Sequence, residues 1–336
     1  MHLFELTRTL VDIDSTTGRE RQVGDFLFDH LQDLATRTNG TVERIPVVDD
    51  RFNVFATWDE PTVVLSTHMD TVPPFFPSSE DDDFIHGRGA CDTKGGIAAM
   101  IQAIEELLGA GRRSFGLLLV VGEETDSAGA QTANRHPRGS RFLVNGEPTE
   151  NRLALGSKGM LYMALEAAGR AAHSAYPELG DSAIDKLMDA LARLKTVPLP
   201  SDAVLGETTL NIGTLSGGRA HNVVADQARA EVTSRTVGDT AELRRNLAAA
   251  VHSVPGVRIA EIRETPAIHL GSLPGFETTI VKYTTDVPRL SAWGEPFLLG
   301  PGSIHVAHTP EERVAKHDLE AAVHLYKEMV CRLQDR

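Results

Sequence analysis

The feature that most constrains this chain is a helix with an apolar stripe, flanked by two apolar runs that resemble strands. The runs Thr62–Ser66 and Phe115–Val121 are apolar without strict alternation, which is typical of strands covered on both faces. Gly95–Leu108 carries apolar residues at helical spacing, and Gly109 and Gly111 end that pattern. A strand, a helix and a strand in this order predict an α/β fold with helical crossovers.

After Lys158 the order of the expected elements changes. A strand, a helix, two strands, a helix and a last strand follow one another, which is the ferredoxin-like plan. We therefore expect an inserted second domain over residues 158–271, with a first domain over residues 1–157 and 272–336. The expected elements of the inserted domain are Leu161–Ala167, Ser182–Leu194, Thr208–Leu215, Ala228–Val237, Thr240–His252 and Val257–Ile262.

Composition excludes several classes of function. The 336 residues carry a formal net charge of −14 and no basic stripe, which argues against a nucleic-acid partner. No run of eighteen apolar residues occurs and the first residues lack the layout of a signal peptide, so we expect no membrane association. With only Cys91 and Cys331, the chain is no disulfide scaffold, and we expect a cytoplasmic protein. The acidic run Glu80–Asp83 is expected to be solvated surface.

Five short motifs concentrate the residue types that bind metals. The first two are Ser66–Pro73, which holds His68 and Asp70, and Gly87–Gly96, which holds Asp92 before the long helix. Residues two apart in extended chain face the same way, so Asp70 can support His68 as the outer partner of a metal-bound histidine. Each motif alone is ambiguous, because His-x-Asp is common and Asp92 could simply cap the helix.

The other three motifs place acids and histidines after further apolar runs. Glu123 and Glu124 follow one expected strand, Glu147 follows another, and a later segment holds His305 and His308. Two adjacent acids at a strand end point to different sides, so one can bind metal while its neighbour faces the substrate. Active sites of α/β sheets lie at the carboxyl ends of strands, which is where these acids fall.

Together the five motifs resemble those of the zinc hydrolase family that contains acetylornithine deacetylase, succinyl-diaminopimelate desuccinylase, aminoacylase and glutamate carboxypeptidase. The resemblance covers nearly the whole chain, including its two-domain layout. It implies a mixed-sheet zinc-peptidase catalytic domain with helices on both faces, and an inserted ferredoxin-like α+β lid and dimerisation domain. It also implies two zinc ions, which cobalt or manganese could replace.

The family's ligand roles can be carried over to the matching positions of this chain. Asp92 resembles the carboxylate that bridges the two metals. His68 and Glu147 resemble the other ligands of one metal, and Glu124 and His308 resemble those of the second. The resemblance therefore implies a complete set of five ligands.

The remaining catalytic roles follow from the same resemblance. Glu123 resembles the general base, and Asp70 the outer partner of a histidine ligand. His308 is preferred to His305 because the family's ligand precedes an x-x-acid-Glu pattern, matched here by Thr309–Glu312. Cations about 3.5–4 Å apart can share a hydroxide and lower its pKa, and Glu123 would pass the proton of the water to the leaving amine.

Two further signatures of the family fall in the inserted domain. Gly169–Pro177 resembles the segment whose histidine, here His173, reaches an active site, and Ser216–Val224 resembles a second segment with Asn222 as its polar contact. The resemblance implies a homodimer through this domain, in which His173 acts on the site of the other subunit. Arg235 matches an arginine that holds the free carboxylate of a small-molecule substrate.

We therefore expect a hydrolase that cleaves the amide bond of an N-acyl amino acid, of acetylornithine or acetyllysine deacetylase or succinyl-diaminopimelate desuccinylase type. A dipeptidase or carboxypeptidase of the same family is the alternative, because both cut an amide near a free carboxylate. A non-catalytic metal-binding relative would be expected to lose its base or its ligands, and all of these are present. Cys91 has no evident base near it in the sequence and is not expected to act as a nucleophile.

Overall fold

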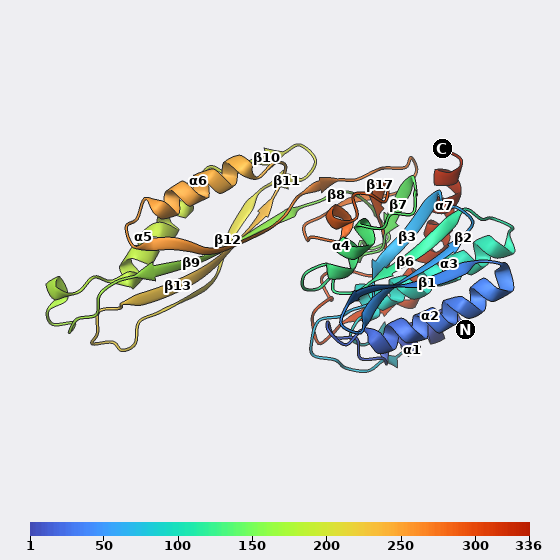
Figure 1. Cartoon of the computed structure of the whole chain (residues 1–336), viewed down its shortest axis with the longest axis horizontal. Helices are drawn as coiled ribbons and strands as arrows, with labels where there is room; N and C mark the ends of the chain where they lie inside the picture. The colour runs from blue at the N-terminus through green and yellow to red at the C-terminus, as the bar shows by residue number, and fades with distance from the viewer. The chain divides into compact units, whose positions relative to one another are not determined.

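The computed structural model describes residues 1–336, which divide by contact into two compact units (Figure 1). The first unit consists of Met1–Leu155, Leu270–Thr279 and Thr285–Arg336, and the second of Gly156–His269 and Ile280–Thr284. The chain enters the second unit after Leu155 and leaves it after His269, and both of these boundaries lie two residues before the ones expected from the sequence. The segment Ile280–Thr284, which the sequence assigns to the first domain, belongs by its contacts to the second unit.

The first unit is built on a six-stranded mixed sheet with the order β1-β2-β6-β3-β7-β17 (Figure 1). β3 pairs in parallel with β6 and β7, and β17 pairs in parallel with β7. β1 and β2 form an antiparallel hairpin, and β2 joins the sheet antiparallel to β6. The strands are Thr41–Val48 (β1), Arg51–Trp58 (β2), Val63–His68 (β3), Phe115–Val120 (β6), Phe142–Asn145 (β7) and Glu295–Leu298 (β17).

Helices cover both faces of this sheet, as the family resemblance implies. Successive strand residues point to opposite faces, so Val63 and Leu65 join one apolar cluster while Val64 joins another. Four helices pack in the first cluster, and α4 and the segment after η3 pack in the second. The four are Leu3–Val11 (α1), Arg21–Thr38 (α2), Gly95–Gly109 (α3) and Lys316–Gln334 (α7), and the opposite face has Ala128–Asn134 (α4) and the 3₁₀ helix Val287–Arg289 (η3).

The second unit has a four-stranded antiparallel sheet with the order β12-β13-β9-β14. Its two helices share one apolar cluster with the sheet, to which α5 contributes the stripe of Leu187, Leu191 and Leu194. The elements follow the predicted ferredoxin-like order. They are Gly159–Ala168 (β9), Ala183–Leu194 (α5), Thr209–Gly217 (β12), Gln227–Thr236 (β13), Ala241–His252 (α6) and Val257–Thr265 (β14).

Short strands complete the fold in two small sheets, β15-β8-β16 and β18-β5-β4, and in the pair β10-β11. The acidic run Glu80–Asp83 is exposed, and Asp81 accepts backbone hydrogen bonds from Asp83 and Phe84 in a turn. No helix combines the length and the apolar character needed to cross a membrane. The bounds are Ser79–Glu80 (β4), Phe84–His86 (β5), Leu153–Ser157 (β8), Ser201–Asp202 (β10), Gly206–Glu207 (β11), Ile268–His269 (β15), Thr278–Val281 (β16) and Arg313–Ala315 (β18), with helical turns at Ala90–Lys94 (η1) and Pro177–Leu179 (η2).

Candidate metal centre

Three parallel strands of the first unit end at the same edge of the sheet, and polar residues stand at each end. His68 is the last residue of β3, Glu123 and Glu124 follow β6, and Glu147 follows β7. Asp92 lies in η1, the turn that leads into α3. Because the strands run in the same direction, their carboxyl ends gather these side chains into one region.

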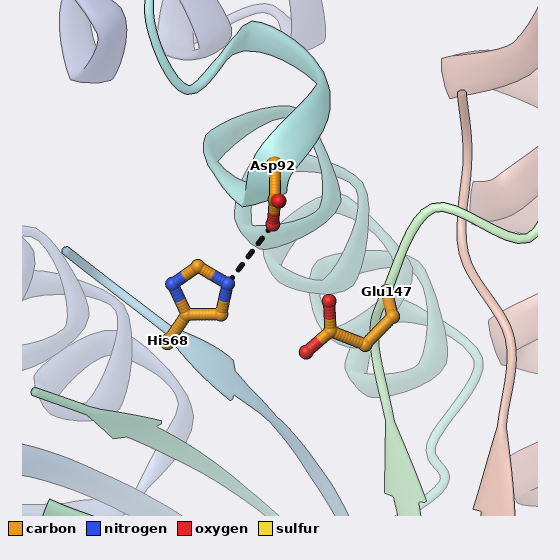
Figure 2. A group of neighbouring side chains, drawn as sticks. All are labelled: His68, Asp92 and Glu147. Atoms are coloured by element: carbon orange, nitrogen blue, oxygen red, sulfur yellow. Dashed lines mark hydrogen bonds and ion pairs between the residues drawn. The ribbon is translucent and has the colours of Figure 1, made fainter. Parts of the chain in front are cut away.

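Three of these residues form what we call the inner cluster, which consists of His68, Asp92 and Glu147 (Figure 2). All three are buried, and their ligand atoms lie within 4.8 Å of one another. The Nε2 atom of His68 lies 3.0 Å from Oδ1 of Asp92. The carboxylate of Glu147 points toward the same space, and its buried Oε1 atom has no hydrogen-bond partner.

A second triad, the outer cluster, consists of Asp92, Glu124 and His308, again with ligand atoms within 4.8 Å of one another. The Nε2 atom of His308 lies 3.0 Å from Oε1 of Glu124 and 3.3 Å from Oδ2 of Asp92. The side chain of His308 is 48% exposed, and its backbone is left-handed with φ at 63°. Asp92 thus turns one carboxylate oxygen to each histidine, which is the placement expected of a bridging ligand.

The electrostatics of the two clusters fit the binding of cations. Although burial alone would lower the pKa of His68, the Asp70 and Asp92 side chains hold it well above its usual range. Hydrogen bonds to Asp92 and Glu124 raise the pKa of His308 to about 10. Burial raises the pKa of Glu147 well above its usual range. Histidine nitrogen and carboxylate oxygen are the donors that zinc and similar divalent ions prefer, so the two triads fit a pair of such ions.

Asp70 holds the loop that carries the two adjacent glutamates. Its Oδ1 atom accepts the backbone N–H of Glu123 at 3.0 Å, and its Oδ2 atom accepts that of Glu124 at 3.2 Å and the hydroxyl of Thr17 at 2.8 Å. Toward His68 the geometry differs from the expected carboxylate–imidazole pair. The Nδ1 atom of His68 lies 3.0 Å from the backbone carbonyl oxygen of Asp70 but 3.6 Å from its carboxylate.

Glu123 is half-buried beside the clusters. Burial raises its pKa well above the usual range, and the negative charges of Glu147 and Asp286 act in the same direction. A carboxyl group with a raised pKa can accept and return a proton near neutral pH, which is what a general base in hydrolysis requires. The position of Glu123 next to Glu124 therefore suits the role that the sequence predicts for it.

Asp286 is a buried carboxylate that sequence reasoning did not find. Only 1% of the residue is exposed, and neither carboxylate oxygen has a hydrogen bond within 3.5 Å. Burial raises its pKa to about 6. Its charge contributes to the raised pKa of Glu123 and of Glu147, which places it close to the clusters. It lies in no motif of metal-binding residues, so nothing in the sequence marks it.

Two residues of the motifs take no part in the clusters. His305 is exposed and belongs to neither triad. Cys91 is buried, and burial raises the pKa of its thiol well above the usual range. A buried thiol that stays protonated is a poor nucleophile, which agrees with the expectation that Cys91 does not act as one.

Three predicted site residues belong to the second unit. His173 and Asn222 are both exposed, and their loops lie side by side, because Ser174 donates its backbone N–H to the carbonyl oxygen of Asn222 at 3.0 Å. Arg235 lies near the end of β13 and is half-buried. Its buried Nη1 atom has no hydrogen-bond partner, so the guanidinium retains a free donor for an anion.

Comparison with known proteins gives this geometry a context. The chain is 39% identical to a peptidase M20 domain-containing protein of Schizosaccharomyces pombe, over 98% of this chain and 84% of the relative. It is 40% identical to a probable carboxypeptidase of Aspergillus fumigatus, over 99% of this chain and 87% of the relative. Both alignments span nearly the whole chain, so they cover both units.

Solved structures share the fold at low sequence identity. A tripeptidase of Staphylococcus aureus superposes with a TM-score of 0.82 at 22% identity, covering 98% of each chain. A dinuclear metal-binding peptidase of the M20 family from Bacillus subtilis superposes with a TM-score of 0.68 at 15% identity, covering 99% of this chain and 98% of that one.

The family model described as peptidase family M20/M25/M40 matches residues 64–332. The match begins within β3 and ends within α7, so it includes all the residues of both clusters. The chain therefore belongs to peptidase family M20/M25/M40 and is a metal-binding hydrolase that acts on amide bonds.

Proposed function

We propose that this hydrolase is a two-metal carboxypeptidase that removes the C-terminal residue of short peptides. The observation that carries the proposal is the pair of clusters that share Asp92, with Glu123 directly beside them. Several curated relatives at about this level of similarity are named probable carboxypeptidases, and they favour this activity over the deacylase that the sequence first suggests. Both reactions break an amide next to a residue with a free carboxylate.

The residues proposed to hold the two metals are those of the clusters. His68 and Glu147 would hold the inner ion, Glu124 and His308 the outer ion, and Asp92 both. Zinc suits this donor set, and cobalt or manganese could take its place. Bound ions would polarise the scissile carbonyl and lower the pKa of a water molecule.

Glu123 is proposed to move the proton during hydrolysis. Its raised pKa lets it take a proton from the attacking water and return it to the leaving amine. Asp70 supports this role because it fixes the backbone N–H groups of Glu123 and Glu124. The two adjacent glutamates are therefore held in one rigid turn, one for the proton and one for the metal.

The second unit is proposed to recognise the substrate. Arg235 would bind the C-terminal carboxylate, and its unpaired Nη1 atom supports this role. His173 and Asn222 would contact the reacting carbonyl, with His173 acting from the other subunit of a homodimer. Losing one hydrogen-bond donor to a developing oxyanion typically costs ~10²–10³ in rate.

A substrate series tests the proposed activity. The protein should cleave an N-acetylated dipeptide at its internal peptide bond, and should act far less well on the same compound with a C-terminal amide. Arg235→Lys should raise the Michaelis constant for the carboxylate substrate much more than for the amide. Preferential cleavage of acetylornithine or acetyllysine would contradict the proposal and restore the deacylase. A requirement for a free N-terminus would instead indicate a dipeptidase or an aminopeptidase.

A mixing experiment tests the proposed dimer. Glu123→Ala and His173→Ala proteins should each be nearly inactive alone. When the two are mixed and subunits exchange, one site of each heterodimer combines an intact Glu123 with an intact His173, so activity should reappear. No recovery despite demonstrated exchange would mean that His173 acts within its own chain or has no role.

A further inference from the structure

Glu312 is a buried carboxylate to which the proposed mechanism gives no role. Only 1% of the residue is exposed. Its Oε1 atom accepts three backbone N–H groups from one short loop, those of Gly89 at 2.9 Å, Cys91 at 3.3 Å and Asp92 at 3.1 Å. A single carboxylate oxygen thus binds the N–H of Asp92 itself and two N–H groups of the chain that leads into it.

The surrounding structure holds Glu312 firmly in this position. Its Oε2 atom forms an ion pair with Arg88, and both side chains are buried. Its carbonyl oxygen accepts the N–H of Gly87 at 3.0 Å. The next residue, Arg313, begins β18, which pairs with β5 in register with His86. The segment that contains Glu312 is therefore bound to the loop through both backbone and side chain.

The backbone of the loop holds Asp92 only in part. Lys94 donates its N–H to the carbonyl oxygen of Gly89 at 2.8 Å and so closes the turn around Asp92, whereas the N–H of Asp92 itself is bound by Glu312. Asp92 has φ at −119° and ψ at 88°, outside the helical region, although α3 begins three residues later. Gly89 has φ at 85°, and an added Cβ would lie 2.7 Å from the side chain of Thr71. The regular helical hydrogen bonds of α3 therefore do not set the position of Asp92, and the contacts with Glu312 act together with the Lys94–Gly89 bond.

We propose that Glu312 is a positioning residue that sets the separation of Asp92 and His308. His308 lies four residues before Glu312 in the same segment, so the carboxylate connects the segment of one ligand to the loop of the other. This inference rests on the proposed two-metal function. Outer-shell partners of this kind orient ligands and typically change metal affinity by ~10–100-fold when they are removed.

If Glu312 has this role, its removal should lower the metal affinity of the two clusters unequally. Both ligands that Glu312 connects belong to the outer cluster. The other ligands of the inner cluster, His68 and Glu147, stand at the ends of β3 and β7, which are held by the central sheet. Loss of the Glu312 carboxylate should therefore weaken the outer metal much more than the inner one.

The variants must avoid leaving the buried charge of Arg88 without a partner, which would destabilise the fold by itself. We therefore compare two double variants, Arg88→Met with Glu312→Gln and Arg88→Met with Glu312→Met. The glutamine keeps a carbonyl oxygen that can accept the loop N–H groups, whereas the methionine cannot. Glu311→Gln is the matched control, because Glu311 is the exposed neighbour.

The experiment titrates each metal-stripped full-length protein with Co²⁺, following heat and visible absorption, and checks folding by thermal unfolding. The double variant with Glu312→Met should bind the second ion ~10–100-fold more weakly than the wild type does. Its affinity for the first ion should change less than about threefold. The double variant with Glu312→Gln should keep most of the wild-type affinity for the second ion, and Glu311→Gln should bind both ions as the wild type does.

Equal binding by the two double variants, whether both are normal or both are weakened, would overturn the proposal. Equal weakening of the binding of both ions would also overturn it. So would a Glu312→Met double variant too unstable to bind metal, if the Glu312→Gln double variant were equally unstable. If the wild-type protein itself binds fewer than two ions, the proposed two-metal function fails, and the role of Glu312 fails with it. Two ions in the wild type with no difference among the variants would remove only the role of Glu312.

Discussion

The inner and outer clusters share Asp92 but lie in different kinds of structure. His68 ends one strand of a buried sheet and Glu147 lies two residues after a parallel neighbour, and both are almost fully buried. His308 stands on a loop with a left-handed backbone, and about half of its side chain is exposed. The same bridging carboxylate therefore joins a position fixed by the core to one fixed by loop contacts.

This difference predicts two unequal metal sites. In the inner cluster Glu147 has a buried oxygen without a partner, and burial of an unpaired carboxylate is costly. A cation at that position removes the cost, so metal binding there is coupled to the stability of the fold. In the outer cluster the carboxylate of Glu124 already has a partner, because Nε2 of His308 lies 3.0 Å from its Oε1 atom. We expect the inner ion to bind more tightly and the outer ion to exchange with solvent.

The largest effect is expected from Glu123, which adjoins the outer cluster without belonging to it. Glu123→Ala should lower kcat by ~10²–10⁴-fold, because a positioned acid–base contributes about that much. It should still bind two metals, as counted by elemental analysis of the purified protein. Glu124→Ala should instead lose the outer ion. If Glu124→Ala kept both ions while Glu123→Ala lost one, the two roles would be reversed.

Substitution of single ligands should change the affinity of one metal site and not of the other, by a smaller factor than the change in kcat above. His308→Gln should weaken the outer ion by at least ~10–100-fold, the range for outer-shell changes, because it removes a ligand directly. Its inner ion should remain, and so should most of the thermal stability. Glu147→Gln should weaken the inner ion and lower the stability of the metal-loaded protein. Equal loss of both ions from each variant would show that the clusters bind as one unit.

The metal affinity of the outer site should change less per pH unit than it does in the ligand variants, but with a clear sign. The pKa of His308 is raised to about 10, above the ordinary value of 6.5. Its ion pairs therefore stabilise the metal-free protein below pH ~6.5 and are lost as pH rises through about 10. A metal must displace this proton, so its apparent affinity should rise up to about tenfold per pH unit between pH ~7 and ~9. Titration with Co²⁺ at several pH values measures this slope, and a flat profile would mean that His308 is already neutral.

Local patterns in the sequence indicated where two residues of the inner cluster lie, although each motif alone left its role open. Apolar runs identify β3 and β7, and their parallel pairing brings His68 and Glu147 to the same edge of the sheet. The same patterns gave the ferredoxin-like order of the second unit. The family resemblance supplied the roles of all five expected ligands and of Glu123, which spacing alone leaves ambiguous.

What the sequence did not predict depends on contacts between distant segments. Glu312 binds Gly89 across 223 positions, and its role follows from the pairing of β18 with β5, two strands of three residues each. Strands this short carry no detectable alternation. Asp286 is buried beside the site by the packing of η3, and a lone aspartate in a polar stretch gives no sign of burial. The Asp70 contacts with the loop of Glu123 likewise appear only once β3 and β6 are paired.

Metal stoichiometry measured together with peptidase activity tests the central claim most directly. The chelated protein is titrated with Zn²⁺, and bound metal is counted while hydrolysis of an N-acetylated dipeptide is followed in the same samples. The two-cluster account predicts two ions per chain, with full activity reached only when the second ion binds. Saturation at one ion, or full hydrolysis by protein from which metal has been exhaustively removed, would contradict it.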